Sequence, residues 1–128
     1  MAIPGGELEY AVLSALWEMG SASARELHSR VGAPAGLVYT TVAKVLDRLF
    51  AKGLVQRHLA GKAFLYRARI ARPVVEKARA RRLLGAFFGD SPRPTVSFLV
   101  EAIDDLDPDL LKELSRAVSA RRKARRGS

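Results

Sequence analysis

Apolar residues recur at helical spacing through the N-terminal part of the chain and predict three helices. The first stripe predicts a helix that ends at Gly20, since glycine is common directly after a helix C-terminus. Ser23 and Glu26 match a capping box, which predicts a short second helix reaching about Val31. A third stripe predicts a longer helix that begins at about Val38. The first and third stripes consist of Leu8, Ala11, Val12, Ala15, Leu16 and Met19, and of Val38, Val42, Val45, Leu46 and Leu49.

The pattern changes from helical spacing to alternation directly after Gly53. Leu54–Leu59 and Ala63–Ala68 read as two strands joined by a turn at residues 60–62, which predicts a β-hairpin. A short helix, a turn and a longer helix with a polar face form a helix-turn-helix. Because a hairpin follows at once, the sequence predicts a winged helix, with the hairpin tip as the wing.

After Ala71-Arg72-Pro73 the pattern is helical again and predicts three amphipathic helices. They are interrupted at Gly89–Pro94 and at Asp107-Pro108, where an aspartate cap and a proline suit the start of the last helix. These helices are too short and too apolar to bury themselves well alone, which predicts a partner surface, most simply a second copy. The expected fold is mainly α with a small β-hairpin: a winged-helix DNA-binding domain over 1–70, a helical dimerisation domain over 71–120 and a basic tail over 121–128.

The charge balance is strongly basic. Twenty-two Lys and Arg against thirteen Asp and Glu leave a formal net charge of +9, which favours polyanionic partners. Five of the cations lie between Arg121 and Arg126. Two interpretations of this tail stay open. It is a disordered arm that adds nonspecific DNA affinity, or a solvated helix end whose cations suit the macrodipole.

Several classes of protein are excluded by what the sequence lacks. There is no cysteine, so disulfides, thiol nucleophiles and cysteine zinc sites are ruled out. No apolar run approaches a bilayer span and the N-terminus does not read as a signal peptide, so a cytoplasmic protein without membrane insertion is expected. His28 and His58 have no carboxylates at metal spacing, and no catalytic constellation stands out. We therefore expect no metal, no cofactor and no enzyme activity.

One polar row on the predicted third helix suits contact with DNA. Thr40, Lys44 and Arg48 are four residues apart, so they lie in one row. Two cations and a hydroxyl can hydrogen-bond to base edges and phosphates in a major groove. On an isolated helix they would be a solvated face, but the hairpin and the basic balance favour DNA contact. Asp47 is expected to pair with Lys44 or a neighbouring cation.

Two further positions are candidates for contact with the DNA backbone. Lys62 lies at the predicted wing tip, where a lysine either tracks phosphates or only aids solubility. Arg57 or Arg67 could assist, depending on which strand face each occupies. Ser23 begins the second helix, where backbone amides can bind a phosphate; simple capping is the other interpretation, and for Ser23 both can hold.

Several motifs together resemble the BlaI/MecI/CopY family of bacterial repressors. They are L-E-Y-A-V-L-S-A-L-W (Leu8–Trp17), A-R-E-L-H (Ala24–His28), Y-T-T-V (Tyr39–Val42), L-x-R-L-x-x-K-G-L-V (Leu46–Val55), G-K-A-F-L-Y-R (Gly61–Arg67) and L-D-P-D-L-L-K-E-L (Leu106–Leu114). The resemblance extends from Glu7 to about Val118. It implies a homodimer on a palindromic operator that controls genes of β-lactam resistance or copper export. It also implies that Tyr39, Thr40, Thr41, Lys44 and Arg48 face the DNA and that Lys62 sits on the wing.

The resemblance also implies how repression ends. In the penicillinase repressors of this family, a partner protease, a membrane-bound sensor, cuts an Asn-Phe bond in the C-terminal part. The aligned pair here is Ser97-Phe98, so the asparagine is replaced. Copper-responsive relatives carry a C-terminal cysteine motif, which this chain lacks.

The sequence thus predicts a dimeric winged-helix repressor that covers a promoter and blocks polymerase. Its predicted partners are a double-stranded DNA operator and a second copy of the chain. Two alternatives stay open. One is a ligand-responsive winged-helix regulator of the multidrug type, which an open apolar pocket near residues 70–90 would favour. The other is an architectural or RNA-binding protein, which sequence-independent affinity would favour.

Overall fold

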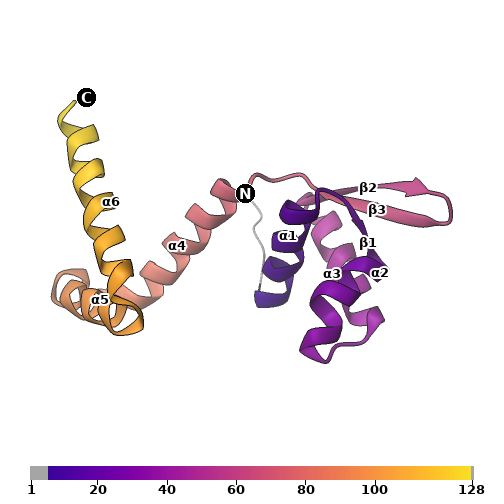
Figure 1. Ribbon diagram of the computed structural model, residues 1–128, viewed down its shortest axis with the longest axis horizontal. Coiled ribbons are helices and arrows are strands. Elements are labelled where there is room, and N and C mark those ends of the chain that lie inside the picture. The colour runs from indigo at the N-terminus through magenta and orange to yellow at the C-terminus, as the bar shows by residue number, and fades with distance from the viewer. Residues whose placement is uncertain (1–5, 128) are drawn as a thin grey trace. The chain divides into compact units, whose positions relative to one another are not determined.

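The computed structural model describes residues 6–127 and divides the chain into two compact units, Met1–Arg81 and Arg82–Ser128 (Figure 1). Unit 1 contains α1 (Glu7–Met19), β1 (Ala22–Ser23), α2 (Ala24–Leu27), α3 (Tyr39–Ala51), β2 (Val55–Ala60), β3 (Ala63–Ala68) and the start of α4. Helix α4 (Arg72–Phe88) is divided between the two units. Unit 2 contains its later part together with α5 (Pro92–Leu106) and α6 (Pro108–Arg126). The mainly helical fold with a small antiparallel sheet confirms the predicted fold class.

The core of unit 1 lies where α1, α2 and α3 meet the sheet. Its largest fully buried side chains include Leu13 and Leu16 of α1, Leu27 of α2, and Leu46 and Leu49 of α3. Helix α1 ends at Met19 as expected, with Gly20 at φ 82°, a left-handed conformation that glycine adopts without strain. Burial of this kind contributes roughly 1.5–3 kcal/mol per leucine, so the α1–α3 contact stabilises the unit strongly.

The predicted capping box is present, but the second helix is shorter than predicted. The Ser23 hydroxyl accepts from the Glu26 backbone N–H at 3.1 Å, and the Glu26 carboxylate accepts from the Ser23 N–H at 2.9 Å. Helix α2 ends at Leu27, and one wider, π-type turn continues to Gly32. A Cβ at Gly32 would meet Val42 at 2.6 Å, so this glycine lets the turn approach α3 closely.

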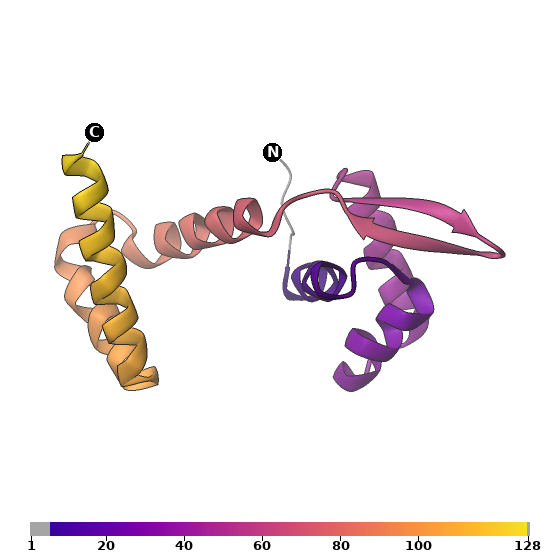
Figure 2. The ribbon, with the colours of Figure 1, turned by 45° about the horizontal axis from the view of Figure 1, so that its top comes forward.

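The sheet has three strands where the sequence predicted two. Strand order is β1-β3-β2, and β1 pairs with β3 through Ala22↔Tyr66 and Ser23↔Leu65. A strand of two residues has no alternation to detect, which is why periodicity missed it. The hairpin pairs Val55↔Ala68 through Ala60↔Ala63 and turns at Gly61, with φ 68°. Both views of the ribbon show β2 and β3 as one long projecting hairpin, the predicted wing (Figure 2).

One residue of the predicted buried stripe is placed differently. Val38 is 65% exposed and caps α3 in an extended conformation instead of lying inside the helix. The helical phase that buries Val42 begins only at Tyr39, so the stripe prediction was wrong at Val38 and right for the other four members.

The start of α4 packs on α1. Val75 is fully buried, and the Trp17 indole N–H donates to the Ile70 carbonyl at 2.9 Å. The Tyr10 hydroxyl donates to the Glu76 carboxylate, and the Arg79 guanidinium lies 3.4 Å from the centre of the Tyr10 ring. This packing explains why the compact unit continues to Arg81. The domain limits expected from the sequence stay a prediction, since they concern folding and dimerisation.

In unit 2, α5 and α6 form an antiparallel pair joined at Asp107. The Asp107 carboxylate accepts from the Asp109 backbone N–H at 3.0 Å and Pro108 opens α6, as predicted. The two helices face each other through half-buried side chains, which are Leu99, Val100, Ile103, Leu111 and Leu114. Within residues 82–127 no side chain is fully buried.

Among residues 6–127, no helix has both the length and the apolar character that crossing a membrane requires.

Candidate nucleic-acid interface

Helix α3 carries an exposed polar face opposite its buried stripe. Thr40, Lys44 and Arg48 are exposed, and they follow one another at the four-residue spacing that forms a row on a helix surface. Tyr39 is also exposed, at the first position of the helix, while Thr41 is half-buried. The predicted row is therefore open to a partner, and Thr41 is less accessible than the other members of the set.

A hollow of about 380 Å³ lies between the starts of α2 and α3 and the wing. It is lined by Ser23, Ala24, Arg25, Tyr39, Lys62, Ala63, Phe64 and Tyr66. The pairing of β1 with β3 is the cause, because it places the start of α2 beside the hairpin. Three of the predicted site residues, Ser23, Tyr39 and Lys62, are thereby brought to one place from separate parts of the chain.

Ser23 has a structural role in this hollow. Its oxygen accepts from the Glu26 N–H in the capping box, so the capping interpretation is confirmed. A serine hydroxyl that accepts one bond still has its own O–H to donate. The residue can therefore cap α2 and offer a donor at the same time.

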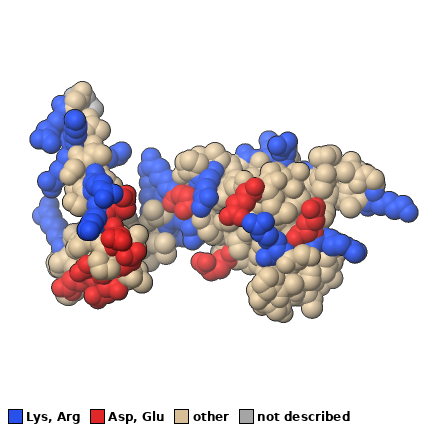
Figure 3. Space-filling model, viewed as in Figure 1, with Lys and Arg blue, Asp and Glu red and all other residues tan. Residues whose placement is uncertain are grey.

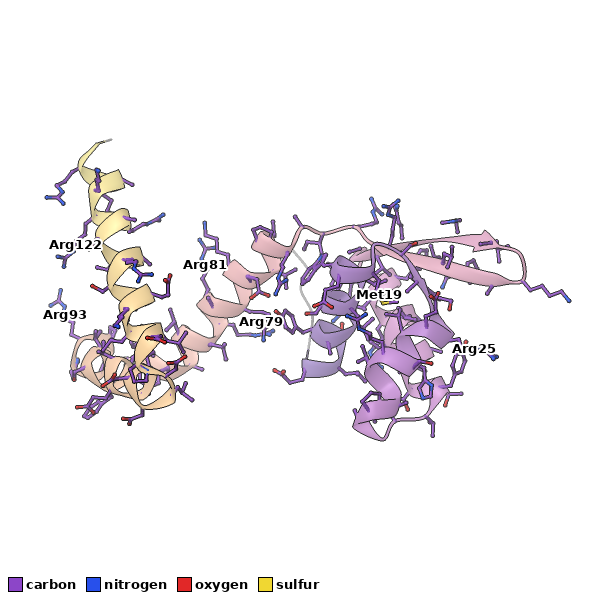
Figure 4. All side chains as sticks on the ribbon, viewed as in Figure 1. Met19, Arg25, Arg79, Arg81, Arg93 and Arg122 are labelled. Carbon is purple, nitrogen blue, oxygen red and sulfur yellow. The ribbon has the colours of Figure 1, made fainter. Side chains whose placement is uncertain are left out.

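Arg25 is a member of the hollow that periodicity and motif spacing did not single out. It is exposed in the first turn of α2, and its side chain projects outward from that helix (Figure 4). The signals in the sequence were its position two residues after a capping serine and its place in the A-R-E-L-H motif. Arg25 lies near the wing only because β1 pairs with β3, and the sequence pattern does not predict that pairing.

Arg57 joins the wing to α3. Its guanidinium lies 4.0 Å from the centre of the Phe50 ring and 4.6 Å from that of Phe64, and Nη1 is 3.3 Å from Oδ1 of Asp47. The expected ion pair of Asp47 is therefore made with Arg57 of β2 and not with Lys44. This arginine bridges α3, β2 and β3, so its cation is held by the protein and does not extend freely from the wing.

A second ion pair fixes the far end of α3. Lys52 donates to both carboxylate oxygens of Glu9, at 2.8 and 3.2 Å, and Glu9 is only 8% exposed. At the near end, the His28 Nε2–H donates to the Leu37 carbonyl at 2.7 Å. Because α3 is held at both ends and along its buried stripe, its exposed row has a fixed orientation within unit 1.

Ser97 and Phe98 lie elsewhere, in unit 2. Both are exposed on α5, and the Phe98 side chain is 61% exposed. The bond between them is inside a helix, so its carbonyl and amide groups are held by helical hydrogen bonds.

Among residues 6–127, no three His, Cys, Asp or Glu side chains are grouped as metal ligands. Figure 3 shows one face of the molecule, with Lys and Arg side chains at the end of the hairpin and along α4 and α6.

A helix-turn-helix whose second helix exposes a polar cationic row and runs into a β-hairpin defines a winged-helix DNA-binding protein. A sequence model of the penicillinase repressor family matches residues 5–120, so the chain belongs to that family. It is a DNA-binding transcriptional repressor by family and fold. No curated protein matches the chain.

Solved structures agree with this assignment. The solution structure of the DNA-binding domain of the repressor BlaI is 25% identical, with a TM-score of 0.50, over 56% of this chain and 88% of that one. Two regulators share the fold alone. They are BpsR of Bordetella bronchiseptica (21% identity, TM-score 0.50, 77% and 75% covered) and PcaV of Streptomyces coelicolor (24%, 0.51, 80% and 76%).

Proposed function

We propose that this repressor acts as a homodimer that occupies a palindromic operator and blocks polymerase, and that proteolysis in unit 2 relieves repression. One observation carries the DNA part of the proposal: the exposed row of α3 stands beside a hollow that the wing and the start of α2 also line. A duplex seated against α3 would meet all three elements together. Family membership favours this repressor over a sequence-independent architectural or RNA-binding protein.

The proposed roles follow from side-chain chemistry and exposure. Thr40, Lys44 and Arg48 would face base edges and nearby phosphates in the major groove, together with Tyr39 and Thr41 at the start of α3. Lys62 at the wing tip and Ser23 at the start of α2 would contact the DNA backbone. The fixed orientation of α3 supports this division, because base readout needs side chains presented at constant geometry.

The proposal of a dimer rests on the apolar surface of unit 2. Large apolar side chains are between 38% and 80% exposed there, and none within residues 82–127 is fully buried. These side chains are Leu83, Leu84, Phe87, Val96, Phe98, Leu106, Leu110 and Val118. A second copy of the same helices would cover this surface in an isologous contact.

The proposal of proteolytic release rests on Phe98. A partner sensor protease of the kind the family employs would find the Ser97-Phe98 pair exposed on the surface of α5. Cutting there would separate α6 and the later part of α5 from the winged helix, and with them Phe98, Leu106, Leu110 and Val118 of the apolar surface. In a dimer, once one winged helix has bound its half-site, the other is held near the second half-site, which makes the complex tight. Loss of the dimer would remove this gain in affinity.

The decisive experiment combines selection of binding sites with sedimentation. The full chain is used to enrich duplexes from a random library, and its mass is measured free and on the winning duplex. We expect an inverted repeat with half-sites spaced by about 10 bp or a multiple of it, bound by two chains. A chain that sediments as a monomer at micromolar concentration, or that enriches no symmetric sequence, would contradict the proposal.

A further inference from the structure

The end of α6 is a dense, one-signed patch of charge. The helix continues to Arg126, so its last cations are displayed on a regular helical surface. All five are exposed, and none pairs with a carboxylate of residues 6–127; they are Arg121, Arg122, Lys123, Arg125 and Arg126. We call this set the α6 basic end. Three of its arginines, Arg122, Arg125 and Arg126, line a shallow hollow of about 310 Å³.

Charge is separated along α6. The sequence has no acidic residue after Glu113, while six carboxylates stand between Glu101 and Glu113. The space-filling view shows the acidic side chains gathered near the α5–α6 junction and cationic ones over the later part of α6 (Figure 3). Nearer the junction, Lys112 and Arg116 are each close to a carboxylate on the preceding turn. The positive charge of the α6 basic end is therefore not balanced by neighbouring carboxylates of the described residues.

Helix stability does not account for this density. The macrodipole places about half a negative charge at a helix C-terminus, which one or two cations complement. Five cations within one and a half turns repel one another and oppose helix formation. The number of cations in the α6 basic end therefore exceeds what stabilises the helix and is better explained by binding to an external polyanion.

We propose that the α6 basic end is a second DNA-backbone contact of this repressor, separate from the winged helix. Arginine guanidinium groups bind phosphate through two parallel N–H donors, and a row of them matches the regular charge of a duplex. This inference rests on DNA binding by the chain and not on the roles proposed for α3. It assigns the basic end to affinity and not to sequence discrimination.

A membrane surface is a poorer match for this segment. Helices that lie on anionic membranes carry large apolar side chains opposite their cations. After Val118, the positions between the cations of α6 are held by Ser119, Ala120 and Ala124, which offer little apolar area. A double-stranded polyanion needs only the cationic face, so the composition favours DNA.

The test compares two pairs of substitutions in the full chain. R122Q/R126Q removes two cations of the basic end, and K112Q/R116Q removes two from the same helix at the same spacing, each of which already has a carboxylate partner. Glutamine keeps the helix propensity close to that of lysine and arginine. Affinity for a nonspecific duplex is measured over a range of salt concentrations.

We expect R122Q/R126Q to lower the slope of log affinity against log salt by about 1.8, since each lost phosphate contact removes about 0.9. K112Q/R116Q should leave the slope within about 0.5 of the parent. A photo-crosslinker in place of Arg122 should join to the duplex, as should one in place of Lys44.

Three results would overturn the inference. One is an equal fall in slope for both double variants, which would mean that only net charge matters. Another is crosslinking from position 44 without any from 122, which would leave the winged-helix proposal intact. The third is an unchanged DNA slope together with loss of binding to phosphatidylserine vesicles, which would assign the patch to membranes. Crosslinking from 122 alone would instead contradict the role proposed for α3.

Discussion

The guanidinium of Arg57 and the carboxylate of Asp47 connect the wing to α3, with Nη1 and Oδ1 3.3 Å apart. The same guanidinium lies over the rings of Phe50 and Phe64, so one side chain from β2 holds both α3 and β3. Two elements that would contact different parts of a duplex are thereby held at a set separation.

We expect Arg57→Lys to weaken DNA binding although it keeps the charge. A lysine can still pair with Asp47 but lacks the planar group that covers two rings, a contribution of about 0.5–2 kcal/mol. Affinity for the selected operator should fall about twofold to thirtyfold, measured by fluorescence anisotropy. The salt slope should not change. A slope lowered by about one unit in Arg57→Ala, with full affinity in Arg57→Lys, would show instead that Arg57 contacts phosphate.

Lys44→Ala and Lys62→Ala should have different effects. Loss of Lys44 should reduce discrimination between operator and unrelated DNA by about 1–3 kcal/mol, because a base contact is removed, and Thr41→Ala should act in the same sense. Loss of Lys62 should weaken binding to all sequences alike and lower the salt slope by about one unit. Competition binding against operator and scrambled duplexes measures both. If Lys62 sets discrimination and α3 does not, the assigned roles are reversed.

Gly32→Ala should destabilise unit 1. The added Cβ would lie 2.6 Å from Val42 Cγ2 and 2.7 Å from His28 Cδ2, so the turn before α3 would have to move, at a cost of about 1–3 kcal/mol. The control is Gly85→Ala in α4, where nothing lies within 4 Å. That substitution should be neutral or stabilising, since alanine favours a helix more than glycine does. The urea midpoint of each variant is measured with circular dichroism as the signal. Equal midpoints for the two variants would refute the close contact.

Residues 71–81 should add stability to an isolated winged helix. A fragment 1–81 retains the buried Val75 and the Tyr10–Glu76 hydrogen bond, which a fragment 1–70 lacks. Val75→Ala in the full chain should cost about 2 kcal/mol. Val74→Ala, at the neighbouring position that is 40% exposed, serves as its control and should change stability much less. Both fragments should sediment as monomers. Identical unfolding midpoints for 1–70 and 1–81 would show that the start of α4 contributes nothing.

A β-lactam should trigger cleavage in unit 2 of producing cells that carry a partner protease. We expect a fragment ending at Ser97, detected by intact-mass measurement, together with release from the operator. Because the bond lies in α5, the helix must open locally before it is cut, so cleavage should be slow. Ser97→Asn restores the pair found in the family and should accelerate it. An intact chain that nevertheless leaves its operator on addition of a small molecule would contradict proteolytic release.

Periodicity was sufficient for the long elements of this chain and insufficient for the short ones. The stripe from Val42 to Leu49 and the start of α6 at Asp107-Pro108 are specified by local physics, apolar spacing in one case and capping in the other. Strand β1 and the π-type turn to Gly32 are specified by tertiary contacts. Ala22 is a strand residue only because Tyr66 lies opposite it, and no pattern within a few residues encodes that partner.

The same limit applies to the candidate interface. The row of Thr40, Lys44 and Arg48 could be read directly, since residues four apart on a helix always share a face. Arg25 could not, because its proximity to the wing depends on strand pairing across more than forty residues of chain. The sequence places Arg57 on the predicted hairpin, where it could assist DNA binding. Its position over two aromatic rings required the register of the hairpin to be known.

The contact between Glu9 and Lys52 links two positions that lie in separate sequence motifs. The Glu9 carboxylate has little access to water and is bonded to the lysine instead, and removing one partner of such a pair is more damaging than replacing both. The two positions are therefore coupled, and a substitution at one is tolerated only together with a substitution at the other. In a library that varies them separately, nearly every survivor would retain both residues. A library that varies them together would also yield uncharged pairs, and relatives of this chain can be expected to change the two sites in concert.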